Sequence, residues 1–346
     1  MGTSGNDRAM RTIATRSAWD RRLTPLATAG RRFFSGGFGP GALLEQLERR
    51  QHGVGIPELS TVRLARREEP GTLEVWDASV ESPAMVGPLP EAARTLHFRM
   101  RLPKGAALHA VPMAVVVELV PLLGAAPGLL LASRLGQLGV GSVELLAPGH
   151  GRRARTPEGR GEVDTVADFL LMQRAATLEA CALAAWLLAR GHPRVVLTGY
   201  GLGGALAAHA ASVFPVPLAT APLLAPDCAA PVFLEGVLRG AVDLAALTRE
   251  AGREDDARSR LERALGGVSV SAVESPRPAV LLAARADGWV PPASTLRLAR
   301  ALPGSPLRLL PDGHVTSALR QTARAAGTVL EALERMAPLE LATSGD

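Results

Sequence analysis

Three short segments carry residue types that could form a nucleophile–base–acid site. AARADGWVP places Asp287 just after an apolar, strand-like run, and LLPDGHVTS places His314 just after the next such run. An aspartate at one strand end can hold and orient an imidazole at the neighbouring strand end, so that the imidazole acts as a general base. The third segment, LTGYGLGGALA, has the pattern of a strand, a sharp glycine turn and a helix, with Gly201 at its centre.

The turn at Gly201 has the pattern of a nucleophile elbow that lacks its nucleophile. Such an elbow reads G-x-S-x-G between a strand and a helix, because the tight turn excludes bulky flanking residues. Gly199 and Gly203 occupy the flanking positions, Val195–Leu197 supply the strand, and Gly201 stands where the serine belongs. The nucleophile normally has a positive φ that costs a non-glycine residue about 1–3 kcal/mol. Gly201 therefore keeps the geometry and removes the hydroxyl.

The same glycines allow a second interpretation, as a dinucleotide-binding turn. Gly199, Gly201 and Gly204 spell G-x-G-x-x-G, whose backbone N–H groups face a pyrophosphate, and Asp227 follows as the expected acidic residue. However, that fingerprint normally opens the first βαβ unit of a domain, whereas two strands and a long helix are expected before this turn. The order of turn, acid and base along the chain matches a hydrolase triad and favours the hydrolase interpretation.

The remaining pattern is an alternation of strands and helices, which predicts a mostly parallel sheet covered by helices on both faces. A long amphipathic helix is expected at 163–190, and a loop is expected after the strand at 114–120. We therefore expect an α/β-hydrolase fold, with ligands beyond the carboxyl ends of the strands. Strands are expected at 62–65, 73–80, 93–102, 114–120, 142–148, 195–199, 217–226, 279–287 and 307–311, and further helices at 42–50, 203–213, 294–301 and 316–335.

The expected domain spans residues 41–335, with a cap-like insertion at about 229–275 and a C-terminal tail at 336–346. Residues 1–40 form a basic extension with seven arginines against two aspartates. An arginine-rich, acid-poor leader is typical of a mitochondrial or chloroplast targeting segment. A flexible tail that shares the high arginine content of the whole chain explains the pattern equally well.

Composition excludes several classes of protein. The net charge is +5, Lys104 is the single lysine, and only 3% of residues are aromatic, which argues against a nucleic-acid partner. Two cysteines exclude a disulfide framework, and no His or Cys spacing suggests a metal, so no cofactor is expected. Prolines and Glu118 interrupt the apolar stretch from Ala110 to Ser133, so no transmembrane span is expected.

Taken together, these segments resemble the α/β-hydrolase domain-containing protein 18 family. The resemblance extends from Arg21 to Arg335 and rests on collinear matches. It implies an α/β-hydrolase fold, a suspected serine-hydrolase activity on lipid-like acyl esters, and a link to mitochondria. The matching segments are RRFFSGGFGPGALLEQLERR, SP at 82–83, VADFLLMQRAATLEACALAAWLLARG, the elbow LTGYGLGGALAAHAASVFPVPLATAPLLA, ARADGWVP and DGHVTSALRQ.

Carried over to this chain, the resemblance places the acid at Asp287 and the base at His314, but the serine of the family's G-I-S-M-G-G elbow falls on Gly201. A second departure follows the first core strand, where the family has a glycine-rich segment and this chain has LVPLLGA. Pro121 has no N–H to donate to an oxyanion, which leaves the N–H of Leu202 as the expected donor.

These departures predict a pseudoenzyme. Loss of the nucleophile costs about 10⁶-fold in turnover, and loss of one oxyanion donor about another 10²–10³-fold. We therefore expect a structural or accessory subunit of a larger, mitochondrial protein assembly, with other protein subunits as partners and a lipid or acyl group as a further ligand. The alternatives are a residual serine-hydrolase-like esterase or lipase that acts on lipid acyl esters with water or another nucleophile, and a dinucleotide-binding protein that uses the GYGLGG turn.

Overall fold

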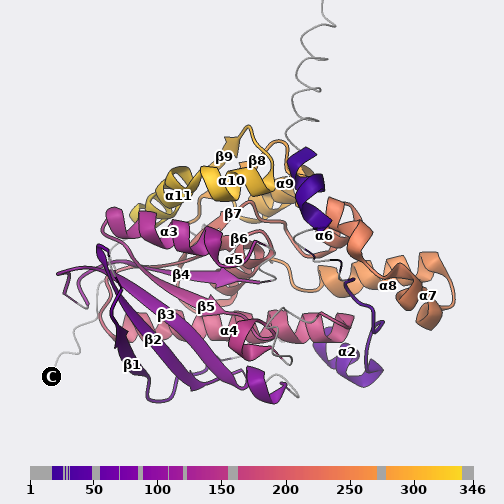
Figure 1. Ribbon diagram of the computed structural model, residues 1–346, viewed down its shortest axis with the longest axis horizontal. Helices are drawn as coiled ribbons and strands as arrows, with labels where there is room; N and C mark the ends of the chain where they lie inside the picture. Colours follow the sequence, from indigo (N-terminus) through magenta and orange to yellow (C-terminus); the bar gives the residue numbers. More distant parts are fainter. Residues whose placement is uncertain are drawn as a thin grey trace, which may run out of the picture.

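A nine-stranded sheet forms the centre of the part of the chain that the structure describes (Figure 1). This computed structural model describes residues 18–25, 28, 30, 32–48, 55–69, 71–84, 89–107, 109–119, 123–154, 163–270 and 278–336. The strand order is β1-β2-β3-β5-β4-β6-β7-β8-β9. The strands span Arg63–Arg67 (β1), Leu73–Glu81 (β2), Thr95–Pro103 (β3), Met113–Glu118 (β4), Gly141–Leu146 (β5), Val195–Tyr200 (β6), Ala219–Leu223 (β7), Leu281–Ala284 (β8) and Leu307–Leu310 (β9).

The sheet is antiparallel from β1 to β5 along this order and parallel from β5 to β9. The prediction of a mostly parallel sheet is therefore confirmed. The central strands β4 (MAVVVE) and β6 (VVLTGY) have every residue but the last one buried, because helices cover both of their faces. The carboxyl ends of β4, β6, β8 and β9 lie at one edge of the sheet, where such folds bind ligands.

The helices lie in two layers, with α3, α10 and α11 on one face of the sheet and α2 and α4 on the other (Figure 1). Alternate residues of β4 pack against the two helix layers. Val115 and Val117 belong to the core formed with α4 and α5, whereas Ala114 and Val116 belong to the core formed with α3 and α11. The helices span Gly41–Glu48 (α2), Ala126–Gln137 (α3), Val166–Ala189 (α4), Leu202–Val213 (α5), Ala230–Leu234 (α6), Leu244–Ala251 (α7), Glu254–Gly266 (α8), Pro292–Ala301 (α9), His314–Arg320 (α10) and Thr322–Glu334 (α11).

Three expected elements differ from the structure. The expected loop after β4 contains the helix α3, and Pro127 lies in its first turn, where a missing N–H costs no hydrogen bond. The expected closing helix at 316–335 is two helices, α10 and α11, which meet at Gln321. The prediction that α4 is amphipathic is wrong: it is buried on most sides, because the sheet, α2, α5 and α8 surround it.

A buried ion pair fastens α4 to the first strands of the sheet. Arg153 Nη2 lies 2.6 Å from Glu179 Oε1, and both side chains are fully buried. Ser82 Oγ donates a hydrogen bond to the same carboxylate at 2.5 Å. Arg153 also donates to the carbonyl oxygens of Leu146 and Ala93, each at 2.7 Å. Each charge is therefore compensated, and removal of one partner would leave the other buried and unpaired.

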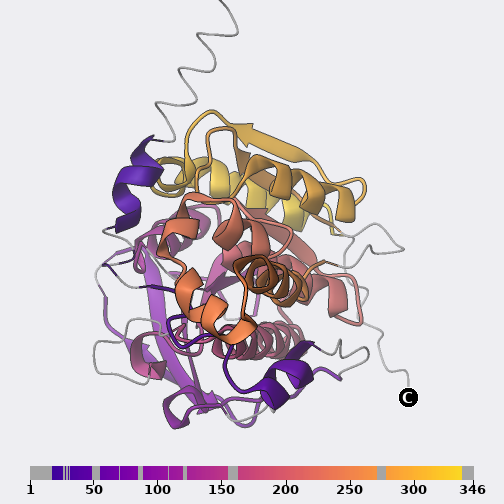
Figure 2. The same ribbon diagram turned by 90° about the vertical axis from the view of Figure 1, so that its right-hand side faces the viewer.

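Part of the predicted extension, residues 1–40, packs against the domain. Phe33, Phe34 and Phe38 are buried, and the ring of Phe34 lies edge-on to that of Phe233 in the insertion, with 5.3 Å between centroids. Residues 18–25 form a helix, drawn in indigo, beside the C-terminal part of the fold in both views (Figures 1 and 2). The domain boundaries stay a prediction, since residues 1–17 and 337–346 lie outside the described residues.

The apolar stretch from Ala110 to Ser133 belongs to the body of the domain. It contains the buried strand β4 and the first turns of α3, a helix of the layer that covers one face of the sheet. Among the described residues, no helix combines the length and the apolar character needed to cross a bilayer.

Candidate active site

Gly201 forms the turn between β6 and α5. Its backbone angles, φ 55° and ψ −124°, lie in a region that L-residues rarely adopt. A β-carbon on Gly199 or Gly203 would collide with the carbonyl oxygen of Val117 in the adjacent strand β4. The two flanking glycines therefore allow β4 and α5 to approach closely, as a nucleophile elbow requires, and Gly201 lies at the apex of the turn.

Asp287 and His314 form a buried, hydrogen-bonded pair. Asp287 follows β8, and His314 is the first residue of α10, directly after β9. His314 Nδ1 lies 2.8 Å from Asp287 Oδ2, and the two side chains are 6% and 3% exposed. The second carboxylate oxygen of Asp287 accepts hydrogen bonds from the N–H groups of Trp289 at 3.0 Å and Val290 at 2.7 Å. The loop thus fixes the carboxylate, and the carboxylate orients the imidazole.

The imidazole of His314 faces Gly201. A β-carbon placed on Gly201 would lie 3.5 Å from His314 Nε2 and 3.4 Å from Cε1, and it would meet no other described side chain within 4 Å. Nδ1 is engaged by Asp287, so Nε2 is the ring nitrogen directed at the turn. The indole of Trp289 stacks on the imidazole, with 5.1 Å between ring centroids. A hydroxymethyl group on residue 201 would stand beside this ring, but a hydrogen atom occupies that place.

The charge of Asp287 makes this imidazole a stronger base. Burial by itself lowers the pKa of His314, but the neighbouring Asp287 carboxylate outweighs burial and raises that pKa above its ordinary value. Burial raises the pKa of the Asp287 carboxyl, whereas its hydrogen bond with the imidazole favours the ionised form. The pair can therefore take up a proton from a bound water or ligand.

Sequence reasoning missed Asp20, which is fully buried behind this pair. Its Oδ2 accepts hydrogen bonds from the N–H groups of Gly288 at 2.8 Å and His314 at 2.9 Å, and its Oδ1 accepts one from Val315 at 3.0 Å. Trp289 Nε1 donates to its main-chain oxygen at 3.3 Å. No local signal marks Asp20, because it is a single acid in an arginine-rich segment and lies 268 residues or more from these partners in sequence.

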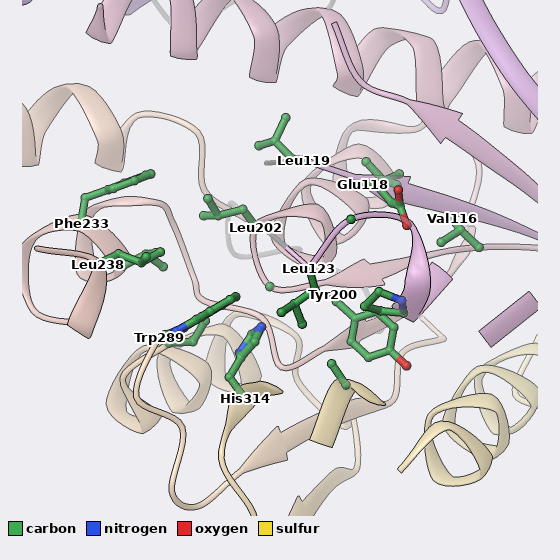
Figure 3. Close-up of a pocket in the computed structure, with 17 residues that line it drawn as sticks. Val116, Glu118, Leu119, Leu123, Tyr200, Leu202, Phe233, Leu238, Trp289 and His314 are labelled. Carbon is green, nitrogen blue, oxygen red and sulfur yellow. The ribbon is translucent and has the colours of Figure 1, made fainter. Parts of the chain in front are cut away.

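A largely apolar cavity opens beside the pair. The empty space between its walls, open mouth included, is about 750 Å³. Glu118 and His314 lie on different walls, and the insertion supplies part of a third wall (Figure 3). The apolar lining includes Leu119, Leu123, Leu202, Phe233, Leu238 and Trp289.

The sequence connected two residues, Leu202 and Pro121, with the oxyanion site, and only Leu202 is among the described residues. Leu202 lines the cavity and is the first residue of α5, so its N–H has no acceptor within the helix. Pro121 lies outside the described residues. Leu119 and Leu123, on either side of it in sequence, contribute aliphatic side chains to the cavity wall.

The residues of the dinucleotide alternative are explained by packing. Asp227 accepts hydrogen bonds from Ser294 Oγ at 2.5 Å and Arg297 Nε at 2.7 Å, so its carboxylate already has partners. A β-carbon on Gly204 would collide with the carbonyl oxygen of Gly199. The close packing of the turn therefore accounts for the glycine spacing without a nucleotide. Within the described residues, no cluster of His, Cys, Asp and Glu could hold a metal ion.

Solved structures of esterases share this fold at low sequence identity. Acetyl xylan esterase 1 from Thermoanaerobacterium sp. JW/SL YS485 is 15% identical with a TM-score of 0.55, and the match covers 87% of this chain and 96% of that chain. The acetyl xylan esterase from Paenibacillus sp. R4 is 16% identical with a TM-score of 0.53, and the match covers 82% and 92% of the two chains. These similarities confirm the expected α/β-hydrolase fold.

The sequence also matches the profile of a protein family described as alpha/beta hydrolase domain containing 18, over residues 32–271. This range includes the elbow at Gly201 and ends before Asp287 and His314, so the pairing of acid and base rests on the structure. Because the match spans well over half of the chain, this protein belongs to the α/β hydrolase domain containing 18 family.

Proposed function

We propose that this protein is a pseudoenzyme with respect to serine-based acyl transfer, and that it uses the retained cavity to bind an apolar, acyl-type ligand. The observation that carries the proposal is the glycine hydrogen at residue 201, beside Nε2 of His314. An acyl-enzyme intermediate needs an oxygen or sulfur nucleophile at that position. Its loss costs about 10⁶-fold in turnover, or roughly 8 kcal/mol of transition-state stabilisation.

The cavity supports this proposal because its described lining holds no residue of the types that usually replace a serine nucleophile in acyl transfer. None of the described residues that line it is a serine, threonine or cysteine. Cys181 is buried elsewhere, and burial raises the pKa of its thiol to about 12, which disfavours a thiolate. The apolar walls are suited to a hydrocarbon chain, which the hydrophobic effect would hold without any covalent step.

A residual esterase is the second candidate, because the pair of Asp287 and His314 is intact. The raised pKa of His314 suits a base that takes a proton from water, and the space above Gly201 could admit that water. Hydrolysis would then proceed by direct attack of water on the ester carbonyl, with no covalent intermediate.

Ester hydrolysis and ligand binding test the two candidates together. Purified protein is mixed with p-nitrophenyl esters of two to ten carbons and with a fluorophosphonate probe, with His314→Gln as the control. The proposal expects the same rate for both proteins, no labelling, and saturable binding of a ten-carbon alcohol that changes the fluorescence of Trp289 in the cavity wall. Turnover that disappears in His314→Gln would establish the residual esterase instead. Absence of both turnover and binding would leave the cavity without a ligand role.

We also propose that the protein acts as an accessory subunit of a larger, mitochondrial assembly. The arginine-rich first 40 residues support the location, and the missing nucleophile supports a role that needs the fold rather than its chemistry. The test is the native mass of the protein in an extract of its own cells, together with its presence in isolated mitochondria. A mass far above 36.1 kDa is expected, and a free monomer outside mitochondria would contradict this part of the proposal.

A further inference from the structure

The acid and the base of the site stand on two separate loops. Asp287 follows β8 and His314 follows β9, and the two residues are 27 positions apart in sequence. Their hydrogen bond forms only if the two loops hold a fixed relative position. One described backbone hydrogen bond joins the loops directly, from the N–H of Ala286 to the carbonyl oxygen of Asp312 at 3.2 Å, and further bonds run through a third segment of the chain.

The carboxylate of Asp20 bridges the two loops. One oxygen accepts N–H groups from both sides: Gly288, directly after the acid, at 2.8 Å, and His314, the base itself, at 2.9 Å. The other oxygen accepts the N–H of Val315 at 3.0 Å. Three charge-assisted hydrogen bonds thus converge on one fully buried carboxylate.

The residues on the partner loop are fitted to this contact. Gly288 has no side chain, and a β-carbon there would lie 3.1 Å from the β-carbon of Asp20. Trp289 Nε1 donates to Thr24 Oγ1 at 3.0 Å, and Thr24 Oγ1 donates to the carbonyl oxygen of Asp20 at 2.7 Å. Trp289 in turn stacks on the imidazole of His314. Residues 18–25 therefore touch the acid loop, the base loop and the aromatic ring that covers the base.

We infer that Asp20 is a positioning residue of the site. The helix at residues 18–25, which we call the strap, connects the two loops, so any proteolytic removal of N-terminal residues must leave this helix in place. The inference limits the predicted leader: a targeting segment that is removed must end before Asp20, although the basic composition extends to residue 40. It concerns the placement of His314 and holds whether or not the cavity binds an acyl ligand.

The pKa of His314 is a readout that a purely structural contact would not change. Asp287 and Asp20 are the described charged groups that act on His314, and both favour the protonated imidazole. Loss of the Asp20 charge should therefore lower the pKa of His314. Loss of a helix-capping acid elsewhere should leave that pKa unchanged.

The experiment measures the pKa of His314 by NMR in the full-length protein, with His314→Gln to assign the resonance. Asp20→Asn keeps the shape of the side chain and removes its charge, and Asp20→Ala removes both. The control is Asp243→Ala, because Asp243 Oδ1 accepts the N–H of Ala246 at the start of α7 and caps that helix without touching the site. A lower pKa of His314 in Asp20→Asn, with no change in Asp243→Ala, is expected.

A pKa of His314 that stays the same in folded Asp20→Asn would overturn the inference. A second measurement does not depend on whether the variants fold. Mass spectrometry of the protein isolated from its own cells gives its mature N-terminus, which should lie at or before residue 18. A mature N-terminus after Asp20 would show that the site exists without the strap, and this result too would overturn the inference.

Discussion

Substitution of Gly201 by serine or alanine measures the strain that the elbow places on its apex. With φ at 55°, any side chain at this position strains the backbone by about 1–3 kcal/mol. Steric clash adds little, because the new β-carbon would lie 3.4 and 3.5 Å from atoms of His314, which is ordinary van der Waals contact. Gly201→Ala should therefore lose about 1–3 kcal/mol in the free energy of unfolding.

Gly201→Ser should lose less than Gly201→Ala. Its hydroxyl can donate to His314 Nε2, and such a bond returns about 0.5–1.5 kcal/mol. The difference between the two variants is then the free energy of the Ser–His hydrogen bond. Urea unfolding followed by circular dichroism gives these values, provided that the slope with denaturant is the same for all variants.

The matched control is Gly191→Ala, because Gly191 has φ 84° and open space around the missing side chain. Its loss reports the cost of a left-handed residue away from the site, about 1–2 kcal/mol. A Gly201→Ala variant as stable as the native protein, or more stable, would refute the assignment of a strained elbow. A serine variant less stable than the alanine variant would refute the position of His314 Nε2.

Three further changes test the energetics of the fold. Burial raises the pKa of Glu118 from 4.5 to about 7, so the folded state binds its proton more tightly and the charged form destabilises the fold increasingly as the pH rises from 4.5 to 7. Glu118→Gln should therefore gain about 1–3 kcal/mol in unfolding free energy at pH 8 and nothing at pH 4, and an equal gain at both pH values would contradict this origin. Glu179→Ala should lose about 3–5 kcal/mol, because it leaves Arg153 buried without its ion pair; a loss under 1 kcal/mol in urea unfolding would show that water replaces the carboxylate. Thr165→Ala should lose about 1 kcal/mol, because Thr165 Oγ1 accepts the N–H of Asp168 at 3.0 Å and caps α4; thermal unfolding should show no loss if the cap is dispensable.

The helices and strands of the fold could be predicted where the pattern of apolar residues and glycines along a short segment was clear. The apolar runs of β4 and β6 and the helix α5 have the expected places, because β-branched runs and glycine turns act over a few neighbouring residues. The helix α3 was missed, since its first half, APGLLLA, has the same apolar character as β4, and Leu129 and Leu130 are exposed where polar residues would mark a surface helix. The burial of α4 on most sides depends on α2 and α8, which are distant in sequence.

The residues of the site also divide into those that the sequence could identify and those that it could not. Asp287 and His314 could be selected because each follows a strand at the carboxyl edge of a parallel sheet. Asp20 could not, because its partners are 268 to 295 residues away and it is a single acid beside Arg21 and Arg22 in an arginine-rich segment. Glu118 was visible in the sequence as an interruption of an apolar run, but its place in the cavity wall was not.

The sequence by itself determined which atoms are present: no hydroxyl at residue 201, an acid and an imidazole after two later strands, and a glycine on each side of the turn. Only the tertiary structure decided that the missing hydroxyl would have faced His314 Nε2, and that an aspartate near the N-terminus holds that histidine in place. The reason is that residue identity is fixed locally by covalent bonds, whereas proximity follows from the strand order β7-β8-β9 and from how residues 18–25 pack against the loops at the carboxyl ends of β8 and β9.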